Sequence, residues 1–167
     1  MGLETDSSSE NLLEANRRVA IRDSSLNVQF VEADARSFHV EPDSMHLVMC
    51  MGASHAFGLG ANAYNNALEQ IMPLLAPGGS LLIAEGYMKQ PATSEYRKLL
   101  GETMPDEMTH SANVTTGKQL GLIPMAAWTS GEDEWDDFEW SHQRIAERRA
   151  EENPDDLEAA SALKRRR

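Results

Sequence analysis

Positive charge and aromatic residues are both scarce in this sequence of 167 residues. Its 15 Lys and Arg are outnumbered by 27 Asp and Glu, which gives a formal net charge of −12, and aromatic residues make up 6% of the chain. Nucleic-acid binding depends on neutralising phosphates with basic side chains, so this charge balance argues against it. We therefore expect a small-molecule ligand and no nucleic-acid partner.

Cysteine and long apolar runs are also nearly absent. Cys50 is the only cysteine, so the chain can form neither an intramolecular disulfide nor a cysteine metal cluster. No apolar run reaches the ~18 residues of a membrane helix, and the first residues lack the pattern of a signal peptide. These absences predict a cytoplasmic protein with no membrane segment and no metal site.

The residues that are present alternate between strand-like and helix-like patterns as far as residue 90. Strands are expected at 2–6, 27–34, 46–51 and 80–85, and helices from about residue 9 and over 62–75. The run His46–Met51 is almost entirely apolar, as expected of a central parallel strand covered on both faces. This order predicts an α/β fold with a doubly wound, mainly parallel sheet.

The remainder of the chain has a weaker pattern. We expect a helix over 94–101, a loop over 103–116, a short helix or turn over 117–120 and an edge strand over 122–129. Two consecutive helices should follow, over 134–152 and from Asn153 onward. We interpret residues 1–167 as one domain, with a ligand-binding core at 1–90 and a substrate-side, helical part at 91–167.

Ligands of doubly wound folds lie beyond the carboxyl ends of the strands, so the residues at those positions are candidates for binding. Asp6, Asp34 and Glu85 each end an expected strand, and the segment 52–55 (Gly-Ala-Ser-His) follows the remaining strand, 46–51. A carboxylate accepts hydrogen bonds from ribose hydroxyls, which suits the end of the second strand of a nucleotide-binding unit. The pattern therefore indicates a nucleotide-like ligand at this edge of the sheet.

Four segments together resemble the class I S-adenosylmethionine-dependent methyltransferases. They are 6–15 (DSSSENLLEA), 30–35 (FVEADA), 47–57 (LVMCMGASHAF) and 74–83 (LLAPGGSLLI), in the order and at the separations of that family's second to fifth strands. The resemblance covers roughly residues 2 to 90. It implies a Rossmann-like methyltransferase core and methyl transfer from S-adenosylmethionine to a small molecule.

The resemblance also implies roles for individual residues. Asp6 would bind the cofactor ribose, Asp34 with the Ala35 backbone would bind the adenine, and Met51, Gly52 and Ser54 would border the methionine part and the methyl group. Facing the acceptor would be His55, Glu85 and Tyr87, with His55 as the candidate base, Tyr87 as a second catalytic residue, and Glu85 and Tyr87 as substrate-binding residues.

One part of the family pattern is missing. The first strand and its Gly-x-Gly loop should stand about 20 residues before Asp6. We therefore expect truncation at the N-terminus and also at the C-terminus, where only one of the family's last two strands has a candidate. The family's first strand lies between its second and fourth, so we expect a gap in the sheet there, dimerisation through that edge, and little methyltransferase activity from this chain alone.

Several residues also have interpretations that do not involve catalysis. Strand-end acids are often turn or cap residues, and a structural role is as plausible for His55 as a catalytic one. Trp135, Phe138 and Trp140 fit packing better than a substrate cage. Two alternatives to the enzyme remain open: a methyltransferase-like interaction or dimerisation unit without cofactor, and a nicotinamide-dependent dehydrogenase.

Overall fold

The structure is a computed structural model that describes residues 2–23, 25–100, 108–155 and 157. It forms two compact units, residues 1–92 with 102–123 and residues 93–101 with 124–167. The first unit contains β1 (Gly2–Asp6), α1 (Ser9–Arg22), β2 (Val28–Glu32), β3 (Met45–Met51), α2 (Ala63–Ile71), β4 (Leu75–Ala84), α4 (His110–Gln119) and three short 3₁₀ helices, η1 (Ser54–Phe57), η2 (Gly60–Asn62) and η3 (Met72–Leu74). The second contains α3 (Ser94–Leu100) and α5 (Glu132–Glu152).

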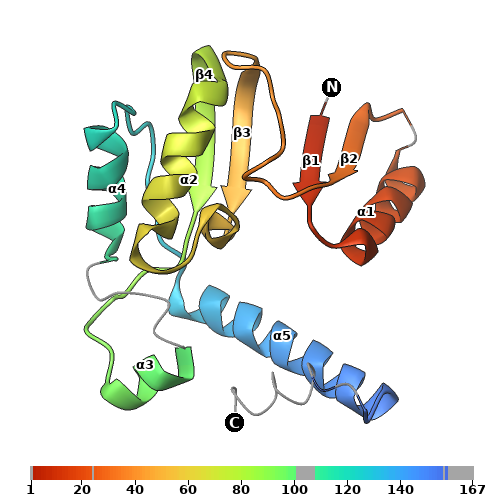
Figure 1. Ribbon diagram of the computed structural model, residues 1–167. Coiled ribbons are helices and arrows are strands. Elements are labelled where there is room, and N and C mark those ends of the chain that lie inside the picture. The colour runs from red at the N-terminus through yellow and green to blue at the C-terminus, as the bar shows by residue number, and fades with distance from the viewer. Residues whose placement is uncertain (1, 24, 101–107, 156, 158–167) are drawn as a thin grey trace. The chain divides into compact units, whose positions relative to one another are not determined.

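The strands of the first unit confirm the predicted α/β fold with parallel pairing. β1 pairs with β2 in parallel, with Asp6 opposite Glu32, and β3 pairs with β4 in parallel, with Met51 opposite Ala84. All four strands point the same way, so their carboxyl ends lie at one end of the unit (Figure 1). Within the described residues the two pairs are separate two-stranded sheets, and no ladder joins β1 to β3.

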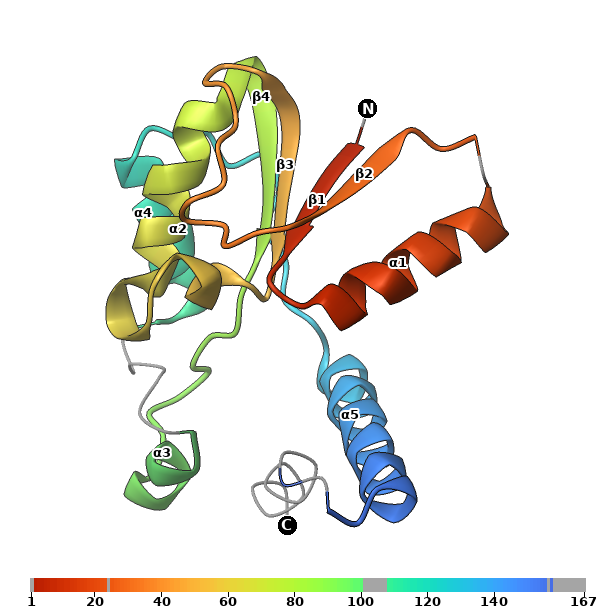
Figure 2. The same cartoon turned by 45° about the vertical axis from the view of Figure 1, so that its right-hand side comes forward.

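The core of this unit lies between α2 and one face of the β3–β4 pair, an arrangement visible in two views (Figure 1, Figure 2). Ala67 and Ile71 of α2 pack against Cys50 of β3, and Leu68 is fully buried. Ile71 follows Ala67 by four residues and Leu68 by three on α2, and Cys50 follows the partly buried Val48 by two on β3, as a helix packed on a strand requires. The predicted helix over 62–75 is shorter than expected, because α2 ends at Ile71, η3 follows it, and β4 begins at Leu75 and not at residue 80.

The other face of β3 differs from the prediction. Leu47, Met49 and Met51 alternate along it and are 55%, 59% and 55% exposed, so the described residues cover β3 on one face and not on both. An unbroken apolar run indicates that a strand prefers two covered faces. It does not show which segment provides the second cover.

The start of α1 is fixed by a side-chain N-cap that the sequence indicates. The Ser8 hydroxyl accepts a hydrogen bond from the Asn11 backbone N–H at 3.3 Å, which satisfies one free amide of the first turn. Leu12 is the one buried residue of α1, while Leu13 is 72% exposed. The β1–α1–β2 segment therefore carries little core of its own.

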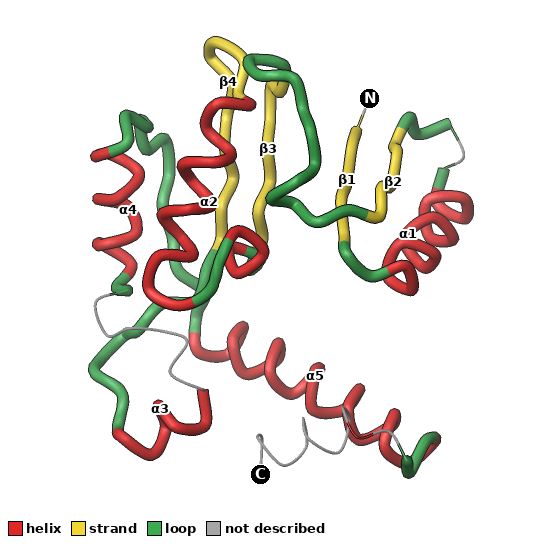
Figure 3. Tube along the Cα trace, viewed as in Figure 1, coloured by secondary structure: helices red, strands yellow, loops and turns green. Residues whose placement is uncertain are grey.

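Two predictions for the region after residue 100 are wrong. Residues 110–116, expected as loop, form most of α4, whose first turn is capped by the Thr109 hydroxyl accepting from the Ala112 backbone N–H at 3.2 Å. The expected edge strand over 122–129 is loop (Figure 3), and its apolar Ile123 and Met125 are 81% and 90% exposed. The predicted helices at 94–101 and 134–152 correspond to α3 and α5. Most of the helix expected after Asn153 lies outside the described residues.

Among the described residues, none of the helices combines the length and apolar character needed to cross a membrane. The same part of the chain holds no group of three or more His, Cys, Asp or Glu side chains placed to bind a metal ion.

Candidate cofactor and acceptor site

Asp6 stands at the carboxyl end of β1, where its carboxylate is held in place by the start of α1. One oxygen accepts a hydrogen bond from the Ser8 backbone N–H at 2.7 Å, and the other accepts from the Asn11 side-chain amide at 3.1 Å. Each carboxylate oxygen can accept more than one hydrogen bond, so both retain capacity for ribose hydroxyls. The interpretation of Asp6 as a cap residue and its interpretation as a ligand residue are therefore compatible.

Asp34 follows β2 and lies at the same end of the pair as Asp6. The Ala33 backbone N–H donates to the Asp6 backbone carbonyl at 3.0 Å, which joins the two strand ends. The Asp34 carboxylate forms a two-point ion pair with the Arg36 guanidinium, at 2.6 and 3.0 Å, and also accepts from the Arg36 backbone N–H. The Arg36 side chain, followed by its backbone N–H, lowers the pKa of Asp34 to about 2.

β3 ends in a backbone turn that leaves open space. The Gly52 backbone N–H extends the ladder by donating to the Ala84 carbonyl at 2.7 Å. Gly52 has φ +65°, and a Cβ at this position would meet no atom within 4 Å. A ligand can thus approach the backbone after Met51, which a side chain at residue 52 would obstruct.

A second acidic group lies at the ends of β3 and β4. The Glu85 carboxylate accepts from the buried Ser54 backbone N–H at 3.2 Å and from the Gly86 backbone N–H at 3.1 Å. Burial raises the pKa of the Tyr64 hydroxyl, and the nearby charge of Glu85 raises it further. Burial likewise raises the pKa of the Cys50 thiol. Ser54 and Glu85, which the sequence singles out, are therefore in direct contact. Tyr64, whose pKa responds to the charge of Glu85, is a residue that the sequence analysis does not single out.

The two predicted catalytic residues differ in their surroundings. His55 lies exposed on η1, directly after Ser54. Tyr87 is partly buried and its ring lies 5.8 Å from the ring of His110, centroid to centroid. The Met88 backbone N–H donates to the Met108 carbonyl at 2.7 Å, so the start of α4 is fixed beside the segment that follows β4. His110 is thus a further candidate residue, which the sequence analysis does not single out because its segment was expected to be loop.

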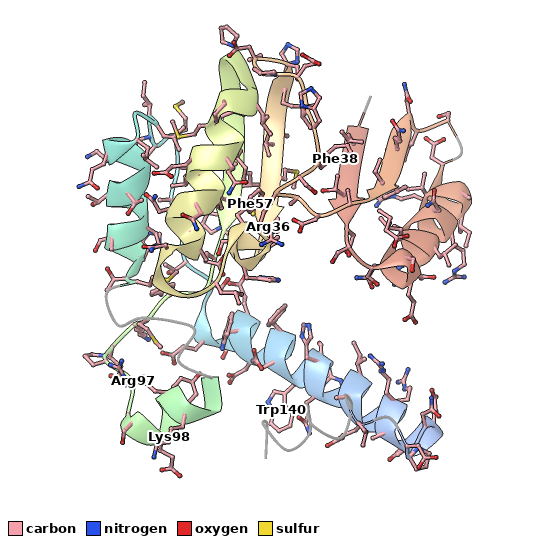
Figure 4. The ribbon with its side chains drawn as sticks, viewed as in Figure 1. Arg36, Phe38, Phe57, Arg97, Lys98 and Trp140 are labelled. Atoms are coloured by element: carbon pink, nitrogen blue, oxygen red, sulfur yellow. The ribbon has the colours of Figure 1, made fainter. Side chains whose placement is uncertain are left out.

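The strand-end residues accordingly form two groups, Asp6 with Asp34 and Ser54 with Glu85. Among the described residues no hydrogen bond joins the two groups. Arg36, labelled in Figure 4, lies in the loop between β2 and β3. This loop is the part of the chain that links the first group to the second.

Comparisons with known proteins agree with this arrangement. Residues 3–79 match the family described as methyltransferase domain. A structure of an S-adenosylmethionine-dependent methyltransferase from Geobacter sulfurreducens, in complex with S-adenosylhomocysteine, is similar with a TM-score of 0.77 and 25% identity over 97% of this chain and 64% of its own. A Thiobacillus denitrificans enzyme of the same description, also with S-adenosylhomocysteine, gives a TM-score of 0.76 and 23% identity over 98% of this chain and 66% of its own.

Among curated proteins, YjhP of Escherichia coli (strain K12), described as uncharacterized, is 30% identical over 161 residues, which is 95% of this chain and 63% of that protein. The chain therefore spans just under two thirds of the length of these relatives. These findings support the family recognised in the sequence: residues 3–79 match a methyltransferase domain, and the chain has the fold of class I S-adenosylmethionine-dependent methyltransferases.

Proposed function

We propose that this chain binds S-adenosylmethionine across the carboxyl ends of β1 to β4 and takes part in methyl transfer to a small-molecule acceptor. The observation that carries the proposal is the placement of Asp6, Asp34 and Gly52 at the ends of β1, β2 and β3, in the order that the family resemblance implies. The two related structures that were crystallised with S-adenosylhomocysteine support the choice of cofactor.

The cofactor would be held by residues of both strand pairs. Asp6 accepts the ribose hydroxyls with the lone pairs that Ser8 and Asn11 leave open. Asp34 accepts from the adenine amino group with the Ala35 backbone beside it, and this contact competes with the Arg36 ion pair. Met51, Gly52 and Ser54 border the methionine part and the methyl group, where the space beside Gly52 admits the ligand.

When bound, S-adenosylmethionine supplies an electrophilic methyl group on a positively charged sulfur. The role of the protein is then to hold the acceptor in line, at about 3 Å from the methyl carbon, and to accept a proton if the acceptor carries one. Glu85 and Tyr87 bind the acceptor in this proposal, and Glu85 is suited to a hydroxyl or amine because two backbone N–H groups fix its carboxylate. His55 is the candidate base, and His110 is a second one because its ring lies against Tyr87.

Isothermal titration with S-adenosylhomocysteine tests the cofactor site. Asp6→Ala should weaken binding by about 1 to 3 kcal/mol, because charged hydrogen bonds to the ribose are lost. Asp23→Ala is a matched control, since Asp23 also accepts from the backbone N–H two residues on, at 2.8 Å, but lies at the other end of α1. Equal affinities for Asp6→Ala and the unchanged chain would remove Asp6 from the site.

The same titration separates the alternative functions. An interaction unit without cofactor would bind neither S-adenosylhomocysteine nor NADH, and a dehydrogenase would bind NADH. If the unchanged chain binds, release of S-adenosylhomocysteine from S-adenosylmethionine in the presence of phenols, thiols or amines identifies the acceptor class. His55→Asn and His110→Asn, compared in that assay across pH, then decide which histidine accepts the proton.

A further inference from the structure

The second unit presents an aromatic stripe that the proposed function does not use. Trp135, Phe138, His142 and Ile145 follow one another on α5 at steps of three, four and three residues, which places them along one side of the helix. Trp135, Phe138 and Ile145 are 51%, 50% and 57% exposed. Six residues of α5 are partly covered, and five of them share a different side of the helix: Glu139, Gln143, Ala146, Glu147 and Ala150, with Ser141 apart from them.

The stripe is ordered within the helix before any partner binds. The Trp135 and Phe138 rings stack with centroids 5.5 Å apart, and the Phe138 and His142 rings lie 4.3 Å apart. The Phe138 carbonyl and the His142 ring nitrogen Nδ1 are 2.9 Å apart, a hydrogen bond that fixes the imidazole. A preordered row of aromatic rings loses little side-chain entropy when it is covered, which suits an interface.

The charges of α5 indicate which occupant fits. The half from Glu132 to Ser141 contains six acidic residues and no basic residue, whereas the half from His142 to Glu152 contains three arginines and three glutamates. Two parallel copies would place acidic half against acidic half, which is unfavourable. Two antiparallel copies place each acidic half against Arg148 and Arg149 of the other copy, which the helical spacing sets at the flank of the stripe and in line with it.

We propose that α5 pairs with α5 of a second copy of this chain in an antiparallel helix pair. With the two-fold axis near residue 140, the spacing of the stripe sets Trp135 against the partner's Ile145 and Phe138 against the partner's His142. Glu134 and Arg148 flank the stripe on the same side. The antiparallel register brings Glu134 of each copy close to the partner's Arg148, so each dimer contains two such pairs. Glu139 lies near its own counterpart, and this like-charge contact keeps the association weak.

Sedimentation velocity of the full chain over a range of protein concentrations tests the proposal. We expect a concentration-dependent monomer–dimer equilibrium in the unchanged chain. Trp135→Ala should raise the dimer dissociation constant at least ~10-fold, as loss of a central aromatic contact does. The control is Trp140→Ala, because Trp140, labelled in Figure 4, is 61% exposed and its spacing places it on the opposite side of α5 from the stripe. This variant should dimerise like the unchanged chain.

A charge exchange tests the antiparallel register and leaves the stripe intact. Arg148→Glu should weaken the dimer, and adding Glu134→Lys to it should restore dimerisation. Because the Glu134 side chain also accepts from the Gly131 backbone N–H at 2.8 Å, the helix content of each variant is checked by circular dichroism. A chain that stays monomeric at every concentration would overturn the proposal. So would a dimer that neither Trp135→Ala nor Arg148→Glu weakens, since it would use another surface, such as the edge of β1 or β3.

Discussion

The two parallel strand pairs of the first unit have the same local plan but very different cores. The β3–β4 pair is covered by α2, with Ala67, Leu68 and Ile71 at 0%, 0% and 2% exposure. The β1–β2 pair is flanked by α1, which buries Leu12 and leaves Ile21 73% exposed. A helix packed on a sheet stabilises through the apolar area that it removes from water, so the β3–β4 pair should be much the more stable.

The proposed functional residues therefore follow strand pairs that differ in how well they are packed. Ser54 and Glu85, which we propose lie at the methyl group and the acceptor, follow the well-packed pair. Asp6 and Asp34, which we propose bind the ribose and the adenine, follow the weakly packed one. A cofactor that contacts both pairs would stabilise the weaker one, because a ligand that binds only the folded state adds its binding free energy to folding. The predictions below test that contrast, from the largest expected effect to the smallest.

Leu68→Ala should cause the largest loss of stability. Leu68 is fully buried on α2, the helix that covers the β3–β4 pair, so truncation should cost about 2 to 5 kcal/mol in the free energy of unfolding. Leu12→Ala should cost less, because the Leu12 side chain is less completely buried than that of Leu68. Leu13 is exposed, so Leu13→Ala should change the free energy of unfolding by no more than about 0.5 kcal/mol. Urea denaturation followed by circular dichroism measures all three. Equal losses for Leu68→Ala and Leu12→Ala would contradict the contrast between the pairs.

Gly79→Ala should have the next largest effect. A Cβ on Gly79 would lie 2.8 Å from both the Ala76 and the Met45 carbonyl oxygens, which are backbone atoms that cannot rotate away. We expect a cost of about 1 to 3 kcal/mol in unfolding free energy. Gly2→Ala in β1 is the control, since its Cβ would meet Val28 at an ordinary 3.5 Å. A neutral Gly79→Ala would mean that the irregular stretch of β4 between Leu75 and Ser80 opens without cost.

The smallest effect concerns the ion pair beside β2. Arg36→Ala should raise the pKa of Asp34 from about 2 toward its ordinary value of about 4, while the backbone N–H of residue 36 keeps it slightly low. Because the folded pKa is lowered, the stabilisation by this pair is present above pH ~4 and is lost as the pH falls toward 2. Carboxyl carbon NMR titration measures the shift. An Asp34 pKa that stays near 2 in the variant would show that the guanidinium is not its main cause.

The sequence predicts the parts of this structure in which apolar spacing and strand-end chemistry agree. β3, α2 and β4 follow from their apolar periodicity, and Asp6, Asp34 and Glu85 are found because parallel strands bring their carboxyl ends to one edge. The helix α4 could not be predicted in this way, because its residues Asn113, Thr115 and Gly117 have weak helix propensity. Its Thr109 cap and its position beside α2 determine it instead, and His110 was missed for that reason.

The apolar residues at 122–129 misled the prediction in the opposite direction. The segment was expected to be a strand, and Pro124 suggested an edge position, but no partner strand lies beside it in the described part of the chain. Strand propensity is realised only when a neighbouring strand supplies hydrogen bonds and a packed face. Such a neighbour is a property of the fold, and the segment alone does not encode it.

The central claim is that one cofactor binds across the ends of both strand pairs, and backbone amide NMR during titration with S-adenosylhomocysteine tests it most directly. Chemical shifts of the amides at Asp6, Ala35 and Gly52 should move together with one dissociation constant, while those of α5 stay unchanged at protein concentrations where the chain is monomeric. Amides of the β1–β2 pair should also gain protection from hydrogen exchange as ligand is added. Shifts confined to one strand pair, or no shift at saturating ligand, would contradict the account.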